Sequence, residues 1–267
     1  MSCKPSLSSI IEKPPKTAEA VNPDMDTTHL NEFSIHTIGY LHSPFKDKFA
    51  VPRQPGLIEG DLGEIELLPP WNRIEALQGL DGFSHIWVMF IFHQAIKPVE
   101  QWRPTVRPPR EGAKRQGVFA TRSPYRPNPI GMSVMKYHGW EKRGKKLFIK
   151  VSGIDIIDQT PVIDIKPYLP YADTIEGATG GFAQSAPQSC DHIQVTISPN
   201  SQQALNKAKQ QYPQFEALLR STLTHNPRPV HFGNIEKRSH FSVQLYQYQI
   251  EWLLEDDNIQ VIQIKPI

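Results

Sequence analysis

Residues 83–92 have the sequence FSHIWVMFIF and contain the longest apolar run of the chain, residues 86–92. A membrane-spanning helix needs roughly 18 such residues, so this run is too short to be one. Its β-branched and aromatic side chains are typical of a β-strand. Because the apolar residues do not alternate with polar ones, we predict that both faces of this strand are buried.

Short strand patterns surround this segment. The predicted strands cover residues 33–41, 65–68, 117–121, 130–137, 147–151, 154–157 and 162–165. Asn72 and Glu75 have the spacing of a capping box, which predicts a short helix to residue 78, ended by Gly79. Many short strands separated by turns are typical of a β-sandwich or a β-barrel. We therefore expect a β-rich domain over residues 32–175.

The two ends of the chain differ from this domain in composition. Residues 1–31 are polar and proline-rich, which predicts a disordered tail. Residues 176–192 are rich in Gly, Ser and Gln and are expected to form a linker or a long loop. Beyond them we predict helices over 198–211 and 213–222 and a hairpin with strands over 246–254 and 259–264. Residues 193–267 should therefore form a small α+β domain.

Positive charge is concentrated in one part of the sequence. The 267 residues have a net charge of +2, but residues 102–150 hold 13 Lys or Arg and two acids, which gives this segment +11 and the remainder −9. Such a segment attracts polyanions, of which nucleic acid is the commonest, although a solvated basic loop has the same composition. The two cysteines and the absence of a secretory leader favour a cytoplasmic location.

Several familiar catalytic patterns are missing from the sequence. It contains no G-x-G-x-x-G, Walker A, H-E-x-x-H or G-x-S-x-G motif. Four other segments carry candidate chemistry. They are residues 52–56, the pair His93 and Gln94, the proline-stiffened residues 120–133, and the aspartate-containing residues 155–168. Each also has a structural explanation, such as a surface loop, a hydrogen-bonded histidine or a turn built by Asp158.

Five segments resemble, in order and spacing, the TrmO (TsaA-like) family. They are residues 49–56, 92–94, 102–110, 120–133 and 164–170, and the resemblance extends over residues 33–265. It implies a β-barrel catalytic domain followed by a small α+β domain, acting as a homodimer. It also implies an S-adenosylmethionine-dependent tRNA methyltransferase, which methylates N6-threonylcarbamoyladenosine at position 37, beside the anticodon.

The resemblance also places the cofactor site. The implied S-adenosylmethionine-binding residues are Pro52, Arg53, Gln54, His93, Gln94, Arg122, Asp155, Ile156, Ile157 and Asp158, and no metal is implied. Gln159 departs from the family, which usually reads Asp-Gly-Thr-Pro here. If the backbone requires a positive φ at this position, Gln159 is strained by about 1–2 kcal/mol.

Catalytic roles follow as hypotheses. Asp158 is the candidate general base, and the alternative is that the threonyl carboxylate of the substrate assists while Asp158 shapes the turn. Arg126 is expected to bind that carboxylate, with Tyr125 and Asn128 at the base. Arg103, Arg107 and Arg110 are expected to bind tRNA phosphates.

Two other classes of function stay open on the residues alone. One is a non-catalytic RNA- or nucleotide-binding barrel. The other is a metal-dependent hydrolase using His85, His93 and the aspartates. No membrane partner is expected.

Overall fold

The structure is a computed structural model that describes residues 33–98, 101–108, 114–185, 193–225, 239–255 and 257–267. The chain divides into two compact units, Met1–Ile35 and His36–Ile267, and the second contains all the helices and strands described here. The predicted tail, residues 1–31, lies outside the described residues. Within the described ranges, no helix combines the length and apolarity that crossing a membrane requires.

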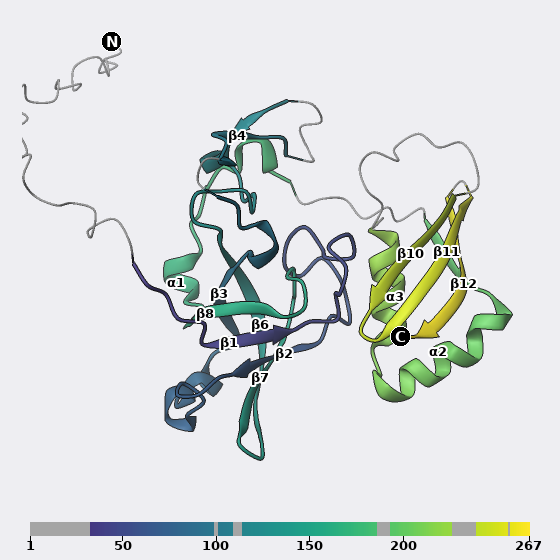
Figure 1. Cartoon of the computed structure of the whole chain (residues 1–267), viewed down its shortest axis with the longest axis horizontal. Helices are drawn as coiled ribbons and strands as arrows, with labels where there is room; N and C mark the ends of the chain where they lie inside the picture. Colours follow the sequence, from purple (N-terminus) through teal and green to yellow (C-terminus); the bar gives the residue numbers. More distant parts are fainter. Residues whose placement is uncertain (1–32, 99–100, 109–113, 186–192, 226–238, 256) are drawn as a thin grey trace, which may run out of the picture. The chain divides into compact units, whose positions relative to one another are not determined.

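Six strands close into a barrel in the order β1-β2-β7-β6-β3-β8, with every neighbouring pair antiparallel (Figure 1). They are β1 Gly39–His42, β2 Gly63–Leu67, β3 His85–Ile91, β6 Ile130–Arg143, β7 Lys146–Ser152 and β8 Thr160–Pro167. The β-rich prediction is confirmed, and of the two architectures that the strand pattern allowed, the barrel is present. Closure leaves these six strands with no unpaired edge.

The strand that dominates the sequence, β3, is buried on one face only. Ile86, Val88 and Phe90 point into the core, whereas the alternate residues from His85 to Ile91 are half-buried. The prediction of burial on both faces is therefore wrong. In a closed barrel only the inward face of a strand is filled by side chains, and the apolar residues of the outward face are covered only in part.

Residues 154–157 are not a strand, although their apolar side chains predicted one. Ile154 and Ile156 are buried, but the backbone amides of Gly153 and Ile154 donate to the carboxylate of Asp61 and not to a neighbouring strand. Burial alone gave the strand-like pattern here. A local sequence pattern cannot predict that the distant Asp61 carboxylate accepts these amide hydrogen bonds.

Three further local predictions need correction. The strand predicted over residues 33–41 begins only at Gly39. The segment after Asn72 forms a 3-10 helix, η2 Ile74–Leu77, and the Asn72 side chain donates to the carbonyl of Lys145 at 3.0 Å and does not cap it. The predicted strand over 117–121 is a two-residue strand, β5 Gln116–Gly117, followed by the 3-10 helix η7 Val118–Ala120. β5 pairs with β4 Thr105–Val106 in a small ribbon. The other short helices are η3 Leu80–Gly82, η4 His93–Ala95, α1 Pro170–Asp173 and η8 Gly181–Ala183.

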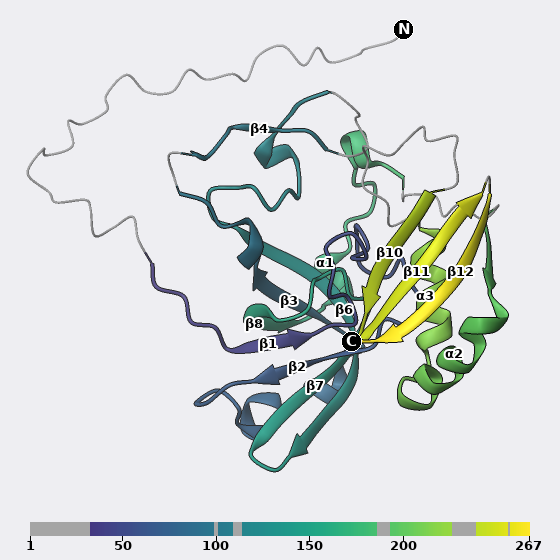
Figure 2. The same cartoon turned by 45° about the vertical axis from the view of Figure 1, so that its right-hand side comes forward.

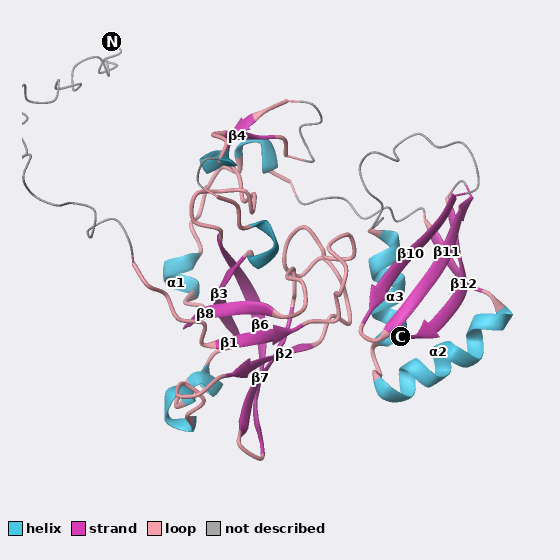
Figure 3. Cartoon of the chain, in the orientation of Figure 1, coloured by secondary structure: helices cyan, strands magenta, loops and turns pink. Residues whose placement is uncertain are grey.

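The C-terminal region has its own sheet, with strand order β10-β11-β12-β9 (Figure 2). Its strands are β9 Gln194–Ile197, β10 Ser239–Leu245, β11 Tyr248–Glu255 and β12 Asn258–Pro266. Helices α2 Pro199–Gln211 and α3 Phe215–Thr224 pack on this sheet, as Figure 3 shows in cyan. The expected hairpin and both helices are confirmed. β9 and β10 are additional strands that the sequence reasoning missed.

The segment that follows β1 is held by residues from distant parts of the chain. Phe45 is fully buried and forms an isolated antiparallel bridge with Leu245. The amide of Tyr246 donates to the carbonyl of Pro44 at 2.7 Å, and the amide of Asp158 donates to the carbonyl of Phe45 at 2.8 Å. Residues 43–46 are therefore fixed, and they lead into the loop that carries Arg53 and Gln54.

Candidate active site

A cleft of about 2020 Å³ gathers the loops that the sequence analysis singled out. Its described lining residues come from four stretches of the chain, within residues 53–57, 95–98 with 101–108, 115–129, and 180–185. Seven of the described lining residues are cations, and none is acidic: Arg53, Lys97, Arg103, Arg107, Arg115, Arg122 and Arg126. Because these charges share one concave surface, their potentials add and favour an anionic ligand.

Two of the predicted cofactor residues meet in this cleft. Arg122 donates from Nη1 to Oε1 of Gln54 at 3.0 Å, and Gln54 donates from Nε2 to the carbonyl of Arg53 at 2.6 Å. Arg53 lies next to this pair and also lines the cleft. The barrel thus brings together two loops that are far apart in the sequence.

Local hydrogen bonds hold the proline-containing loop that follows Arg122. Thr121 donates from Oγ1 to the carbonyl of Val118 at 2.8 Å, and Arg126 donates from Nη1 to the carbonyl of Thr121 at 3.2 Å. Tyr125 lines the cleft with 53% of its surface exposed, and the ammonium of Lys97 lies 5.0 Å from its ring centroid. Asn128 is exposed but is not among the residues that line the cleft.

Asp155 lies close enough to Arg122 for the guanidinium charge to act on its carboxyl group. Burial raises the pKa of the Asp155 carboxyl to about 6, while a hydrogen bond from Ser133 and the charge of Arg122 act in the opposite direction. Ser133 donates from Oγ to Oδ1 of Asp155 at 2.5 Å. Asp155 can therefore balance Arg122 from behind the cleft wall. It is not itself a lining residue.

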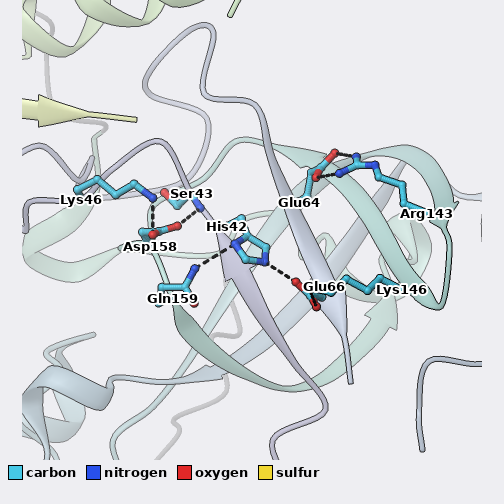
Figure 4. Close-up of polar contacts among 9 residues, drawn as sticks. All are labelled: His42, Ser43, Lys46, Glu64, Glu66, Arg143, Lys146, Asp158 and Gln159. Atoms are coloured by element: carbon cyan, nitrogen blue, oxygen red, sulfur yellow. Dashed lines mark hydrogen bonds and ion pairs between the residues drawn. The ribbon is translucent and has the colours of Figure 1, made fainter. Parts of the chain in front are cut away.

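Asp158 lies outside the described lining of the cleft, and both of its oxygens have partners (Figure 4). The amide of Ser43 donates to Oδ1 at 2.8 Å, and the ammonium of Lys46 pairs with Oδ2. The side chain is only 11% exposed. Asp158 therefore fixes the start of the loop that leads to Arg53 and Gln54.

Gln159 has a φ of 59°, so the strain expected from replacing the family's glycine is present. Its side chain donates from Nε2 to Nδ1 of His42 at 3.0 Å, and Nε2 of His42 lies 3.0 Å from Oε2 of Glu66 (Figure 4). Lys146 pairs with the other oxygen of Glu66 at 2.8 Å. Hydrogen bonds from Lys146 and then from His42 lower the pKa of the Glu66 carboxyl. The contacts from Lys146 through Glu66 and His42 thus hold the side chain of Gln159, whose backbone is strained.

The remaining predicted residues divide into three groups. Arg103 and Arg107 line the cleft, as expected of phosphate ligands. Pro52 and Ile156 are buried, and His93, Gln94 and Ile157 are also absent from the described lining, although His93 and Gln94 directly precede lining residues. Arg110 lies outside the described residues.

Several lining residues escaped the sequence reasoning. Lys97, Arg115, Phe119 and Phe182 belong to no motif quoted above, and Phe119 was assigned to a strand. The adjacent apolar residues Val118 and Phe119 carried no local signal that one of them would be buried and the other exposed. The described residues contain no group of three or more His, Cys, Asp or Glu side chains placed to hold a metal ion.

Comparison with known families gives the same assignment for both halves of the chain. Residues 40–174 match the family model described as the tRNA-methyltransferase O N-terminal domain, and residues 191–267 match the TrmO C-terminal domain. The chain belongs to the TrmO family. The resemblance found in its motifs is thereby confirmed.

Individual TrmO relatives agree in length as well as in sequence. The tRNA (adenine(37)-N6)-methyltransferase of Escherichia coli K12 is 40% identical over 238 residues, which cover 89% of this chain and 100% of that protein. A putative S-adenosylmethionine-dependent methyltransferase of Pseudomonas aeruginosa is 42% identical, covering 82% of this chain and 91% of its own length. A crystal structure of TrmO from Pseudomonas aeruginosa superposes with a TM-score of 0.70 at 36% identity, covering 88% and 99% of the two chains.

Proposed function

We propose that this protein transfers a methyl group from S-adenosylmethionine to N6 of the adenine at position 37 of tRNA. We further propose that the acceptor is N6-threonylcarbamoyladenosine. The relatives' activity supports the first statement. The observation that carries the proposal is the cleft itself, which is lined by the Gln54 and Arg122 pair, by six further arginines or lysines and by exposed aromatic rings.

The residues of the cleft fit the methyl donor. When bound, S-adenosylmethionine supplies an electrophilic methyl group attached to a sulfonium, together with a carboxylate and an adenine ring. Arg53 and Arg122 offer guanidinium groups that suit a carboxylate, and Gln54 offers an amide that suits a polar edge. The Gln54 side chain is held between the Arg53 carbonyl and the Arg122 guanidinium, so the Gln54 and Arg122 side chains are preorganised, which lowers the entropy cost of binding.

Arg126 and Tyr125 are placed to receive the acceptor nucleoside. We assign Arg126 to the threonyl carboxylate, because its guanidinium lines the cleft and is oriented by the carbonyl of Thr121. The exposed ring of Tyr125 is assigned to stacking on the modified base. A contact of Asn128 with the base stays a prediction. Holding donor and acceptor in line supplies much of the rate in a displacement of this kind.

The proton on N6 needs an acceptor. Both oxygens of Asp158 are already occupied by Ser43 and Lys46, and Asp158 lies outside the described lining of the cleft. This arrangement supports the alternative in which the threonyl carboxylate takes the proton. Asp158 is then a positioning residue that holds residues 43–46 and, through them, the loop with Arg53 and Gln54.

The test uses bulk tRNA from a strain that lacks its own enzyme of this type. Purified protein and labelled S-adenosylmethionine are added, the tRNA is digested to nucleosides, and the products are analysed by mass spectrometry. We expect methylated N6-threonylcarbamoyladenosine that depends on protein and donor, and its loss with Arg126→Ala. Donor and RNA binding without methyl transfer would favour the non-catalytic barrel, and activity lost on chelation would favour the hydrolase.

The homodimer that the family resemblance implies, and the cytoplasmic location expected from the composition, are part of the same proposal. Light scattering on the purified full chain would give its mass in solution, where a dimer has twice the 30.4 kDa of one chain. A monomeric mass under the conditions in which methyl transfer is measured would contradict the dimer.

A further inference from the structure

We propose that Phe119 and Trp102 form a stacking platform for the unpaired bases that flank the acceptor adenine in the RNA loop. This inference rests on the proposed function and adds two residues for which the methyl-transfer chemistry has no use. Both side chains line the cleft described above. Phe119 is 75% exposed and Trp102 is 40% exposed.

The backbone directs Phe119 outward. Its neighbour Val118 is buried, and η7 turns the chain so that consecutive residues face different sides. The amide of Thr121 donates to the carbonyl of Val118 at 3.1 Å, as does the Thr121 hydroxyl at 2.8 Å. The exposed ring therefore stands on an anchored turn. An anchored ring loses little conformational entropy when a base stacks on it.

The same ribbon carries Trp102. Strands β4 and β5 pair Thr105 with Gly117, and the amide of Val118 donates to the carbonyl of Pro104 at 2.9 Å. Trp102 precedes β4, and Phe119 follows β5, so the antiparallel pairing places both rings at the same end of the ribbon. Two aromatic residues from distinct segments thus line the cleft from one end of the ribbon.

Cations that follow or precede the ribbon's strands line the same cleft as these rings. Arg103 is adjacent to Trp102, Arg107 follows β4, and Arg115 precedes β5 and donates to the hydroxyl of Thr105 at 3.2 Å. Single-stranded RNA is bound by this combination of stacked bases and neutralised phosphates. A paired helix does not offer base faces, so the occupant is an unpaired loop. The absence of acidic side chains from the described lining agrees with a polyanionic partner.

The test measures RNA binding by the full chain without any methyl donor. The probe is a fluorescein-labelled 17-nucleotide stem-loop with an unmodified adenine at the acceptor position, followed by fluorescence anisotropy. Because one base stacked on an aromatic ring contributes between about 5-fold and 150-fold in affinity, Phe119→Ala should weaken binding by at least about 5-fold. Phe119→Trp should retain it, and Trp102→Ala should weaken it in the same direction.

Matched controls separate stacking from simple loss of apolar surface. Ile96 is aliphatic, 62% exposed and lines the same cleft, so Ile96→Ala should change affinity less than twofold. A stem-loop with abasic sites on both sides of the adenine should bind the native chain at least as weakly as the intact RNA binds Phe119→Ala, because it loses the stacks on both rings. The abasic RNA should show no further loss with Phe119→Ala, because the stack on Phe119 is already absent.

Wild-type affinity in Phe119→Ala, or independent losses from the variant and the abasic RNA, would overturn the platform. Since Phe119 is exposed, circular dichroism of the variant should match that of the native chain. If the chain transfers methyl groups but Phe119→Ala binds RNA with native affinity, the proposed function is retained and the platform alone is refuted. If Phe119→Ala weakens RNA binding but the native chain transfers no methyl group, the platform is supported and the proposed reaction is refuted.

Discussion

Replacing Gln159 by glycine or by alanine tests whether a side-chain contact offsets backbone strain at the turn after Asp158. Gln159 adopts a φ of 59°, and its amide donates to Nδ1 of His42 at 3.0 Å. Gln159→Ala keeps the Cβ, and therefore the strain, but loses the hydrogen bond. Gln159→Gly loses the hydrogen bond and removes the strain as well.

The expected changes in the free energy of unfolding follow from three contributions. A left-handed conformation costs a non-glycine residue about 1–2 kcal/mol. An exposed hydrogen bond of this kind contributes about 0.5–1 kcal/mol. Glycine also lowers stability by about 0.4–1 kcal/mol, because it makes the unfolded chain more flexible. Gln159→Gly should therefore lie within about 1 kcal/mol of the native chain, and Gln159→Ala should be about 0.5–1 kcal/mol less stable than the native chain.

The assay is thermal unfolding followed by circular dichroism, at one pH and one protein concentration. A change of 1 kcal/mol corresponds to about 2–4 °C in Tm for a chain of this size. The expected order of Tm places the glutamine and glycine forms above the alanine form. His42→Ala should lower the Tm of the native chain but have a smaller effect in the Gln159→Gly background, because the shared hydrogen bond is already absent.

An alanine variant more stable than the glycine variant would refute the reasoning, since the strain at residue 159 would then be smaller than the effect of glycine on the unfolded chain. Equal effects of His42→Ala in both backgrounds would show that the contact between residues 42 and 159 contributes nothing.

Three further predictions concern carboxylates and arginines. Asp158→Asn should weaken donor binding, because Asp158 positions the loop that carries Lys46. At saturating donor, its single-turnover rate of methyl transfer should stay within about tenfold of the native rate. Complete loss of turnover with intact donor binding would instead make Asp158 the general base. Burial raises the pKa of the Asp61 carboxyl from 3.8 to about 6 in the folded chain. The folded state therefore binds this proton more tightly than the unfolded state does. The stability that the proton contributes is complete below pH 3.8 and is lost as the pH rises through 6. Urea unfolding from pH 4 to 7 should therefore show the native chain losing up to about 3 kcal/mol relative to Asp61→Asn, and parallel curves would contradict this. Arg103→Ala or Arg107→Ala should weaken RNA binding and reduce the slope of log affinity against log salt by about 0.7; an unchanged slope would exclude a phosphate contact.

Local signals in the sequence predicted most of the strands. The apolar run at residues 86–92, the helix start at Ser198 and Pro199, and the hairpin strand predicted over residues 259–264 all lie where the structure has the corresponding elements. These features depend on periodicity, proline geometry and turn residues, which are properties of neighbouring positions. The same kind of signal failed at residues 154–157, because the amides there bind Asp61, a residue more than 90 positions away.

The candidate site shows the same division. The motif residues Arg53, Gln54 and Arg122 could be singled out because their types and order match a family. Their meeting in one cleft required two loops to approach, and that depends on the barrel. The exposure of Phe119 was likewise decided by η7 and by the pairing of β4 with β5, neither of which has a strong local pattern.

By itself, the sequence determined the β-rich class, the concentration of positive charge in residues 102–150 and the unusual Gln159. Composition and short-range order are sufficient for such conclusions. Only the tertiary structure decided that the sheet closes into a barrel and that Asp158 faces Ser43 and Lys46 and not the cleft. Those partners are 115 and 112 positions away in the sequence. Strand order and register bring such distant residues together, and no local sequence pattern specifies either of them.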